Sequence, residues 1–322
     1  MSNPWPVYIL VSCLVVLPAS SARAQDFPAR TLRVISAEAG GAADLTARLL
    51  AQQLLPLLGR PVVVENQASA SGIVAAMTVA KAAPDGHTLL FYGMTIWIQP
   101  FLKERVPYDP ARDFAPISLV DRQPTVLVVH PSLPVRSVKE LIALARARPG
   151  ELNYAAGGTG SSTFLAGELF KAMARLNIVR VPYKSTAPAM NALLGGQVQF
   201  MFPTIGSIAP HMKSGKVRAL AVTGAERSAL VPNLTTIAAS GLPGYEAEAT
   251  HGLFAPAKTP APIVNRINQA VVQVLGQAEV REKLANAGIE PVGNSPEQFA
   301  AAMQADMAKW GKLIKDIGIR ED

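Results

Sequence analysis

The chain has 322 residues, of which 49% are hydrophobic and 16% charged, so it carries enough apolar material for a large core. This length exceeds what a single hydrophobic core usually serves, and it therefore predicts two domains. The formal charge of +7 comes from scattered basic residues that do not alternate with aromatic ones, which argues against a nucleic-acid partner.

Residues 1–24 predict a cleaved export signal. Their apolar stretch from Val7 to Leu17 is shorter than the roughly 20 residues that a membrane-spanning helix needs. The small-x-small pattern that ends at Ala24 predicts cleavage after that residue. Cys13 is the only cysteine, so the mature chain would have no disulfide and no cysteine metal ligand. The residues before Cys13 also resemble a lipoprotein cleavage box, which leaves lipidation open.

Strand-type and helix-type patterns alternate through the first part of the mature chain. The strands are predicted at 32–36, 61–65 and 88–92, and the helices at 44–58 and 73–82. Such a β-α-β-α-β order joins parallel strands through crossover helices. We therefore expect a parallel sheet with helices on both faces.

A second α/β unit is predicted to begin near Thr125. Its strand-type runs are 125–130, 152–156, 179–182, 200–202 and 217–223, and its helices are 138–148, 162–175 and 187–194. Ser137 and Glu140 have the spacing of a capping box at the start of the first of these helices. The order again predicts a sheet covered by helices.

The chain then returns to a strand-type run near Leu253 and ends in two predicted helices, 263–277 and 296–315, the second with Ser295 as its N-cap. If this tail packs on the first unit, the chain crosses between the units twice, which makes a hinge with a cleft beside it. The expected boundaries are residues 25–124 plus 250–322 for lobe 1 and 125–249 for lobe 2.

Two glycine-rich loops, each between a predicted strand and a predicted helix, are the clearest functional signal. They run from Ser36 to Asp44 and from Ala156 to Thr163. Glycine lets the backbone approach a ligand, and the following helix start offers unpaired N–H groups and a positive dipole end. Two such loops on two lobes predict an anion-binding cleft, although each loop on its own is also compatible with a tight turn.

Motifs of enzymes are largely missing. The four histidines His87, His130, His211 and His251 have no metal-ligand spacing, and neither HExxH nor GxSxG occurs. The glycine loops lack the lysine of a phosphate loop. We therefore expect no metal, no cofactor and no enzymatic activity, although a catalytic triad assembled from distant residues would leave no motif.

Short motifs follow one another in a characteristic order along the mature chain. They are Gly40-Gly41 with Asp44, Val-Val-Val-Glu-Asn at 62–66, Ala-Pro-Asp-Gly at 83–86, Pro-Tyr-Asp-Pro at 107–110, Asp-Phe-Ala-Pro at 113–116, Gly-Thr-Gly-Ser at 158–161, Val-Pro-Tyr-Lys at 181–184, Leu-Leu-Gly-Gly-Gln-Val at 193–198 and Gly-Lys-Val-Arg-Ala-Leu-Ala-Val at 215–222. In this order they resemble the Bug family, the extracytoplasmic solute receptors of tripartite tricarboxylate transporters.

The resemblance implies an α/β, type II periplasmic binding-protein fold, with two doubly wound lobes, a hinge and a ligand cleft between them. It implies a monomeric periplasmic receptor that binds a small carboxylate and delivers it to a membrane permease of the tripartite tricarboxylate type. A periplasmic ligand sensor for a signalling partner would have the same fold and remains an alternative, as does a secreted hydrolase.

The ligand-binding candidates lie in the two loops and at a few further positions. In the first loop they are Glu38, Ala39, Gly40, Gly41 and Ala42; in the second they are Gly158, Thr159, Gly160 and Ser161; the others are Ser69, Thr95, Thr186, Pro203 and His251. Backbone N–H groups of the loops and hydroxyl groups would hold carboxylate oxygens.

Several positions depart from the family pattern. Ala37 stands where an aromatic residue is usual, Pro203 replaces an aspartate, and His251 replaces a frequent tryptophan. Trp97 is expected to refill the volume that Ala37 leaves. If Glu38 faces the cleft it would repel a carboxylate and favour a neutral, cationic or amino-acid ligand, whereas a solvent-facing Glu38 has no such consequence. His251 is open to two interpretations, a hydrogen-bond donor to the ligand or a packed residue of the lobe.

Overall fold

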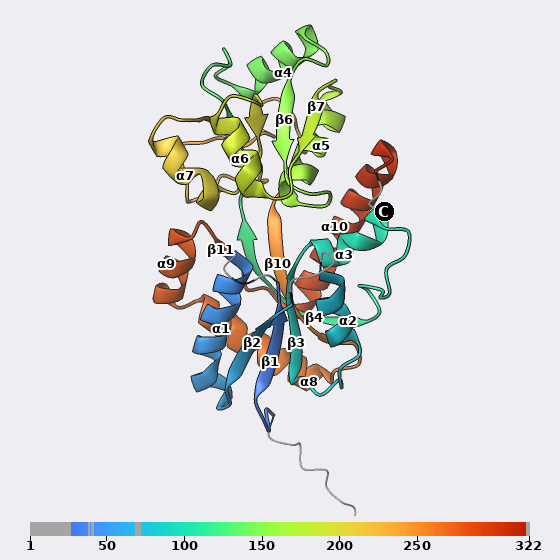
Figure 1. Cartoon of the computed structure of the whole chain (residues 1–322). Coiled ribbons are helices and arrows are strands. Elements are labelled where there is room, and N and C mark those ends of the chain that lie inside the picture. Colours follow the sequence, from blue (N-terminus) through green and yellow to red (C-terminus); the bar gives the residue numbers. More distant parts are fainter. Residues whose placement is uncertain (1–26, 38, 40–41, 68–71, 320–322) are drawn as a thin grey trace, which may run out of the picture.

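The computed structural model describes residues 27–37, 39, 42–67 and 72–319. The expected signal peptide and Cys13 lie outside these residues, and so do Glu38, Gly40, Gly41 and Ser69. Figure 1 shows two lobes, each built around its own sheet, with the long helix α10 rising from the first lobe beside the second.

Lobe 1 is built around a six-stranded sheet in the order β11-β4-β10-β3-β1-β2. The strands are β1 Leu32–Ser36, β2 Val62–Asn66, β3 Thr88–Gly93, β4 Phe114–Gln123, β10 Ala249–Pro256 and β11 Glu290–Pro291. The expected core of β1, β2 and β3 is parallel, but β10 runs antiparallel to both β3 and β4. The parallel arrangement predicted for the first three strands is therefore confirmed, and the whole sheet is mixed because β10 enters it from the other lobe and so runs against its neighbours.

Six helices cover the two faces of this sheet. They are α1 Ala42–Leu58, α2 Ile73–Ala80, α3 Thr95–Leu102, α8 Ala261–Leu275, α9 Ala278–Asn286 and α10 Pro296–Ile317. Alternate residues of the strands point to opposite faces, so one buried cluster joins the sheet to α1, α8 and α9 and another joins it to α2, α3 and α10. Helix α10 begins with Ser295 as the expected N-cap, and Gln298 completes a capping box with it.

Lobe 2 has a five-stranded sheet in the order β7-β6-β8-β5-β9. Its strands are β5 Val126–Val129, β6 Asn153–Ala156, β7 Val179–Pro182, β8 Phe200–Met201 and β9 Arg218–Val222, and its helices are α4 Val138–Ala147, α5 Ser162–Ala174, α6 Thr186–Leu194 and α7 Ile205–Lys213. At the start of α4, Ser137 Oγ accepts from Glu140 N, while the Glu140 carboxylate accepts from Arg136 N rather than from Ser137 N. The expected capping box is thus half formed.

Several elements, namely α3, β4, α7, α9 and the short β11, have no counterpart in the prediction. Helix α3 is apolar over most of its surface and contains Pro100, so it lacks the one-sided apolar pattern of a surface helix. Strand β4 contains Pro116 and ends in polar residues, which weakens its strand pattern. Tertiary packing forms these elements despite their weak local patterns.

Trp97 occupies a different place from the one expected. It is 1% exposed and packs with Phe254 and Phe299 in the core cluster of α2, α3 and α10. Ala37 instead lies against the cluster on the opposite face of the sheet. The expectation that Trp97 refills the volume beside Ala37 is therefore wrong.

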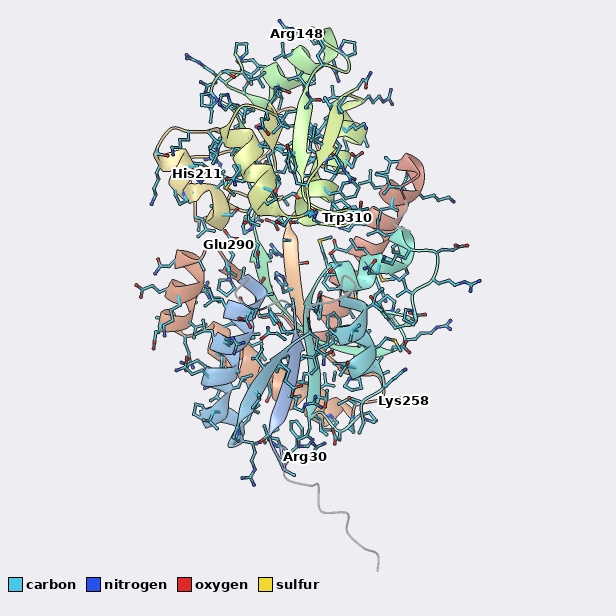
Figure 2. The ribbon with its side chains drawn as sticks, viewed as in Figure 1. Arg30, Arg148, His211, Lys258, Glu290 and Trp310 are labelled. Atoms are coloured by element: carbon cyan, nitrogen blue, oxygen red, sulfur yellow. The ribbon has the colours of Figure 1, made fainter. Side chains whose placement is uncertain are left out.

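The junction of the lobes is formed by β4 running on into β5 and by the segment that enters β10. Thr125 Oγ1 lies 2.5 Å from Thr223 Oγ1 and donates to the Ala247 carbonyl at 3.3 Å, which ties these segments together. Ser228 Oγ donates to Glu290 Oε1 at 2.5 Å. In Figure 2, Glu290 is labelled close to the level at which the lobes meet, whereas Arg30 and Arg148 mark their far ends.

Candidate functional site

The carboxyl ends of β1 in lobe 1 and of β6 in lobe 2 carry the two glycine-rich loops that the sequence singles out. Gly160, in the loop after β6, adopts a φ of +81°, and a Cβ there would lie 2.7 Å from Leu102 Cδ1 at the end of α3. The second glycine loop therefore touches lobe 1 directly. This contact places the second loop at the face of lobe 2 that meets lobe 1.

In lobe 1, the first loop is anchored by a network of polar side chains. The Asn66 amide donates to the Ala37 carbonyl and to Asp44 Oδ1, both at 2.8 Å. Arg48 completes the network by donating to Asp44 Oδ2 at 3.0 Å and to Asn66 Oδ1 at 2.7 Å. Because Asp44 is buried, these partners compensate the removal of its carboxylate from water. They hold the start of α1, which begins at Ala42, against the end of β1.

Replacing Asn66 with leucine should lower the free energy of unfolding by about 1–2 kcal/mol, because the Ala37 carbonyl and the buried Asp44 each lose a donor. Urea denaturation measures this difference. Glu65→Gln is the matched control, since Glu65 precedes Asn66 on β2 and forms only a part-exposed ion pair with Arg33 of β1. Equal stability of the two variants would show that the network does not hold the loop.

The second loop has its own internal bonds. Gly157 N donates to Thr163 Oγ1 at 2.9 Å, and Ser161 caps α5 by accepting from Phe164 N at 3.3 Å. The Ser161 hydroxyl, expected to face a ligand, is thus also the N-cap of the helix. Thr159 Oγ1 accepts from the Arg180 guanidinium at 3.4 Å.

The remaining candidates lie at several distinct places. Thr95 and Thr186 are the first residues of α3 and α6, so both lie at helix N-termini. Pro203 is buried, and its carbonyl accepts from Val126 N at 2.9 Å within lobe 2. Gly158 has open space where a Cβ would be, and Ala39 is exposed.

Two polar residues that sequence reasoning missed hold His251 in place. His251 Nδ1 lies 2.8 Å from Asp121 Oδ1 and 3.2 Å from the side-chain amide of Gln123. Asp121 and Gln123 belong to β4 and His251 to β10, so they meet only because these strands pair. The sequence signal for Asp121 and Gln123 is that polar residues end an otherwise apolar strand. This signal does not identify His251, 130 residues from Asp121, as the partner.

A separate cavity of about 270 Å³ lies between α3, α10 and the strands β4 and β10. Trp97 and Phe299 form its apolar wall, and Arg122, Glu248 and Lys309 supply charged groups. Among the described residues no group of three histidine, aspartate or glutamate side chains is arranged to hold a metal ion. In the same part of the chain, no helix is both long and apolar enough to cross a membrane.

Residues 46–319 match the family model described as the tripartite tricarboxylate transporter family receptor. The UPF0065 protein of the tcbD-tcbE intergenic region of Pseudomonas sp. is 36% identical over 311 residues, which cover 95% of this chain and 93% of that protein. Protein BugT of Bordetella pertussis is 33% identical over 305 residues, which cover 94% of each chain.

Two solved structures with bound acids are similar over nearly their whole length. R. palustris Rpa4515 with adipate has a TM-score of 0.78 and 38% identity, covering 92% of this chain and 99% of that chain. MatC from Rhodopseudomonas palustris with bound malate has a TM-score of 0.74 and 34% identity, covering 89% of this chain and all of that chain. The similarity therefore extends over both lobes.

Proposed function

Because this chain belongs to the tripartite tricarboxylate transporter receptor family, we propose that it captures a small organic acid between its lobes and delivers it to a membrane permease. The observation that supports this proposal is the contact of the second glycine loop with Leu102 of α3, since it shows that this loop of lobe 2 faces lobe 1. Helix N-termini offer unpaired N–H groups to carboxylate oxygens. The resemblance to the Bug family is confirmed by the match with BugT.

Dicarboxylates are the proposed ligand class. Two of the similar structures hold adipate and malate, which are both dicarboxylates. One carboxylate would meet the first loop and the start of α1, and the other would meet the second loop and the start of α5. The proposed contact residues are Glu38, Ala39, Gly40, Gly41, Ala42, Ser69, Thr95, Gly158, Thr159, Gly160, Ser161, Thr186, Pro203 and His251.

The proposal extends to how the protein is exported and organised. Residues 1–24 would be removed on export to the periplasm, and the mature receptor would act as a monomer without covalent chemistry. Lobe 1 would comprise residues 25–124 and 250–322, and lobe 2 residues 125–249. The composition of the two sheets supports this division. Strands β5 to β9 all belong to the second sheet, whereas β10 and β11, which follow them in the chain, belong to the first.

The mature protein should be stabilised by its ligand in a thermal-shift series of adipate, malate, monocarboxylates, amino acids and amides. A ligand at 100 times its Kd adds about 2.7 kcal/mol to the stability of the folded state. For a chain of this size the melting temperature should rise by a few degrees or more. Dicarboxylates should give the largest rises.

Thr159→Ala tests whether the second loop contacts the ligand. Removing the Thr159 hydroxyl should weaken ligand binding if this hydroxyl contacts the ligand. Because Ser161 and not Thr159 caps α5, the melting temperature of the free protein should stay nearly unchanged. Thr31→Ala is the control, since Thr31 is exposed and precedes β1, at the end of that strand remote from the first loop. If no acid raises the melting temperature of the wild-type protein, the receptor proposal fails; if Thr159→Ala binds as tightly as wild type, only this contact fails.

A further inference from the structure

The His251 ring lies across the end of the lobe 1 sheet where the chain enters from lobe 2. His251 is the third residue of β10, and its Cα partner on β3 is Gly93, the last residue of that strand. Its Nδ1 faces Asp121 on β4, on one side of β10. Its Cδ2–Nε2 edge lies on the other side, where a Cβ at Gly93 would be 3.4 Å from Nε2. The ring thus spans β10 from β4 to β3.

The contact with Asp121 determines which ring nitrogen carries a hydrogen. A carboxylate only accepts hydrogen bonds, so Nδ1 must donate to Asp121 Oδ1 across their 2.8 Å separation. An Nδ1 that donates has no free lone pair, so the Gln123 amide 3.2 Å away should present its oxygen to it. Asp121 is fully buried, and its Oδ2 has no hydrogen-bond partner within the described part of the chain. Its position is therefore dictated by β4 and its bond to His251.

The other ring nitrogen, Nε2, has no partner in the described part of the chain. No hydrogen bond to Nε2 occurs among the described residues, and the His251 side chain is 14% exposed. Because the sheet order is β4-β10-β3-β1, the Nε2 edge points toward the ends of β3 and β1. The first glycine loop follows β1, and Thr95 follows β3 at the start of α3.

We propose that Nε2 of His251 donates a hydrogen bond to one carboxylate of the captured acid and that Asp121 is the residue that positions the ring. This inference rests on the proposed function and names a contact of the same cleft. Since Nδ1 already donates to Asp121, a ring that also donates through Nε2 is an imidazolium. The buried Asp121 carboxylate balances that charge, and the ligand carboxylate receives a charge-assisted hydrogen bond.

The affinity test compares two histidines at opposite ends of the same sheet. His251→Gln should weaken adipate binding by about 10- to 100-fold, because a charge-assisted bond is replaced by a neutral one. His87→Gln is the matched control: His87 Nδ1 lies 3.3 Å from Asp85 Oδ1 just before β3, at the end remote from Gly93, and its loss should leave the affinity unchanged. Malate replaces adipate as the probe if adipate does not bind. Calorimetric titration measures the affinities of both variants, and the melting temperature of each variant without ligand is recorded as a check of folding.

Nitrogen-15 spectra of histidine-labelled protein test the positioning role directly. The His251 signals are identified by their loss in His251→Gln. In the free protein Nδ1 should be protonated, in the adipate complex both ring nitrogens should be protonated, and in Asp121→Asn the Nδ1 preference should be lost. Asp121→Asn should weaken adipate binding about 5- to 10-fold, since the ring remains but is less well oriented.

Two outcomes overturn the inference while leaving the receptor proposal intact: adipate affinity of His251→Gln within about twofold of wild type, or an unprotonated Nε2 in the complex. If neither adipate nor malate binds the wild-type protein, the receptor function for dicarboxylates fails and the ligand contact fails with it. The spectrum of the free protein still decides whether Asp121 fixes the hydrogen on Nδ1.

Discussion

Gly206→Val should weaken dicarboxylate binding by about 100-fold or more, which corresponds to about 2.7 kcal/mol. Gly206 lies in the first turn of α7 in lobe 2, and Gly288 lies between α9 and β11 in lobe 1. A Cβ at Gly206 would overlap the carbonyl oxygen of Ala287, and a Cβ at Gly288 would lie 2.5 Å from Gly206 N. The lobes meet here backbone to backbone, with no flexible side chain that could move aside.

A valine at 206 should therefore act as a wedge between the lobes. The substitution does not change a residue of the buried core clusters, so the melting temperature of the free protein should change little, while the ligand loses the contacts of one lobe. Calorimetric titration with adipate measures the affinity. At saturating adipate, small-angle X-ray scattering should give a larger radius of gyration for Gly206→Val than for the wild-type protein.

Ser207→Val is the matched control for this wedge. It introduces the same side chain one residue further along α7, on an exposed position. Its affinity for adipate should equal that of the wild-type protein. Wild-type affinity in Gly206→Val would mean that this glycine contact is not part of the ligand-bound arrangement of the lobes.

Glu248→Gln should stabilise the protein by about 3 kcal/mol at pH 8, the second large effect that we expect. Burial, helped by the acidic neighbours Glu290 and Glu246, raises the pKa of Glu248 from its ordinary 4.5 to about 7, and the nearby Arg122 and Lys309 oppose this rise. The carboxyl group lies against Gly224, where a Cβ would overlap Glu248 Oε1. Ionising it in this place costs free energy that the unfolded chain does not lose.

The sign of the pH dependence follows from the raised pKa. Between about pH 4.5 and 7 the folded state holds a proton on Glu248 that the unfolded state has released, so the wild-type protein loses stability as the pH rises through this range. The amide that Glu248→Gln introduces does not titrate, so the variant lacks this loss.

Urea denaturation at pH 4, 6 and 8 should thus give a stability difference that is small at pH 4, grows through pH 6 and levels off near pH 8. Glu246→Gln is the control, since Glu246 is exposed on the same segment and should change stability by less than about 0.5 kcal/mol. A constant difference across the pH range would mean that Glu248 does not titrate differently in the folded state.

Local features of the chain were sufficient to predict most of its elements and the positions of both glycine-rich loops between a strand and a helix. Strands β1 and β7 have the predicted bounds, and Ser295 begins α10 as its cap. These features depend on residues within a few positions of one another, through the alternation of apolar side chains, capping hydroxyls and glycines. For the same reason the order of short motifs identified the family before any contact was known.

Tertiary structure alone decided the features that join distant parts of the chain. The antiparallel direction of β10, the burial of Trp97 away from Ala37, the pairing of His251 with Asp121 and the contact of Gly206 with Gly288 all depend on how the lobes and strands meet. A strand has the same residue pattern whichever way it runs, and a side chain does not specify its partner across 130 residues. The sequence by itself thus determined most of the elements and the two glycine-rich loops, whereas the packing of strands and lobes determined which distant side chains meet, because such contacts leave no local pattern.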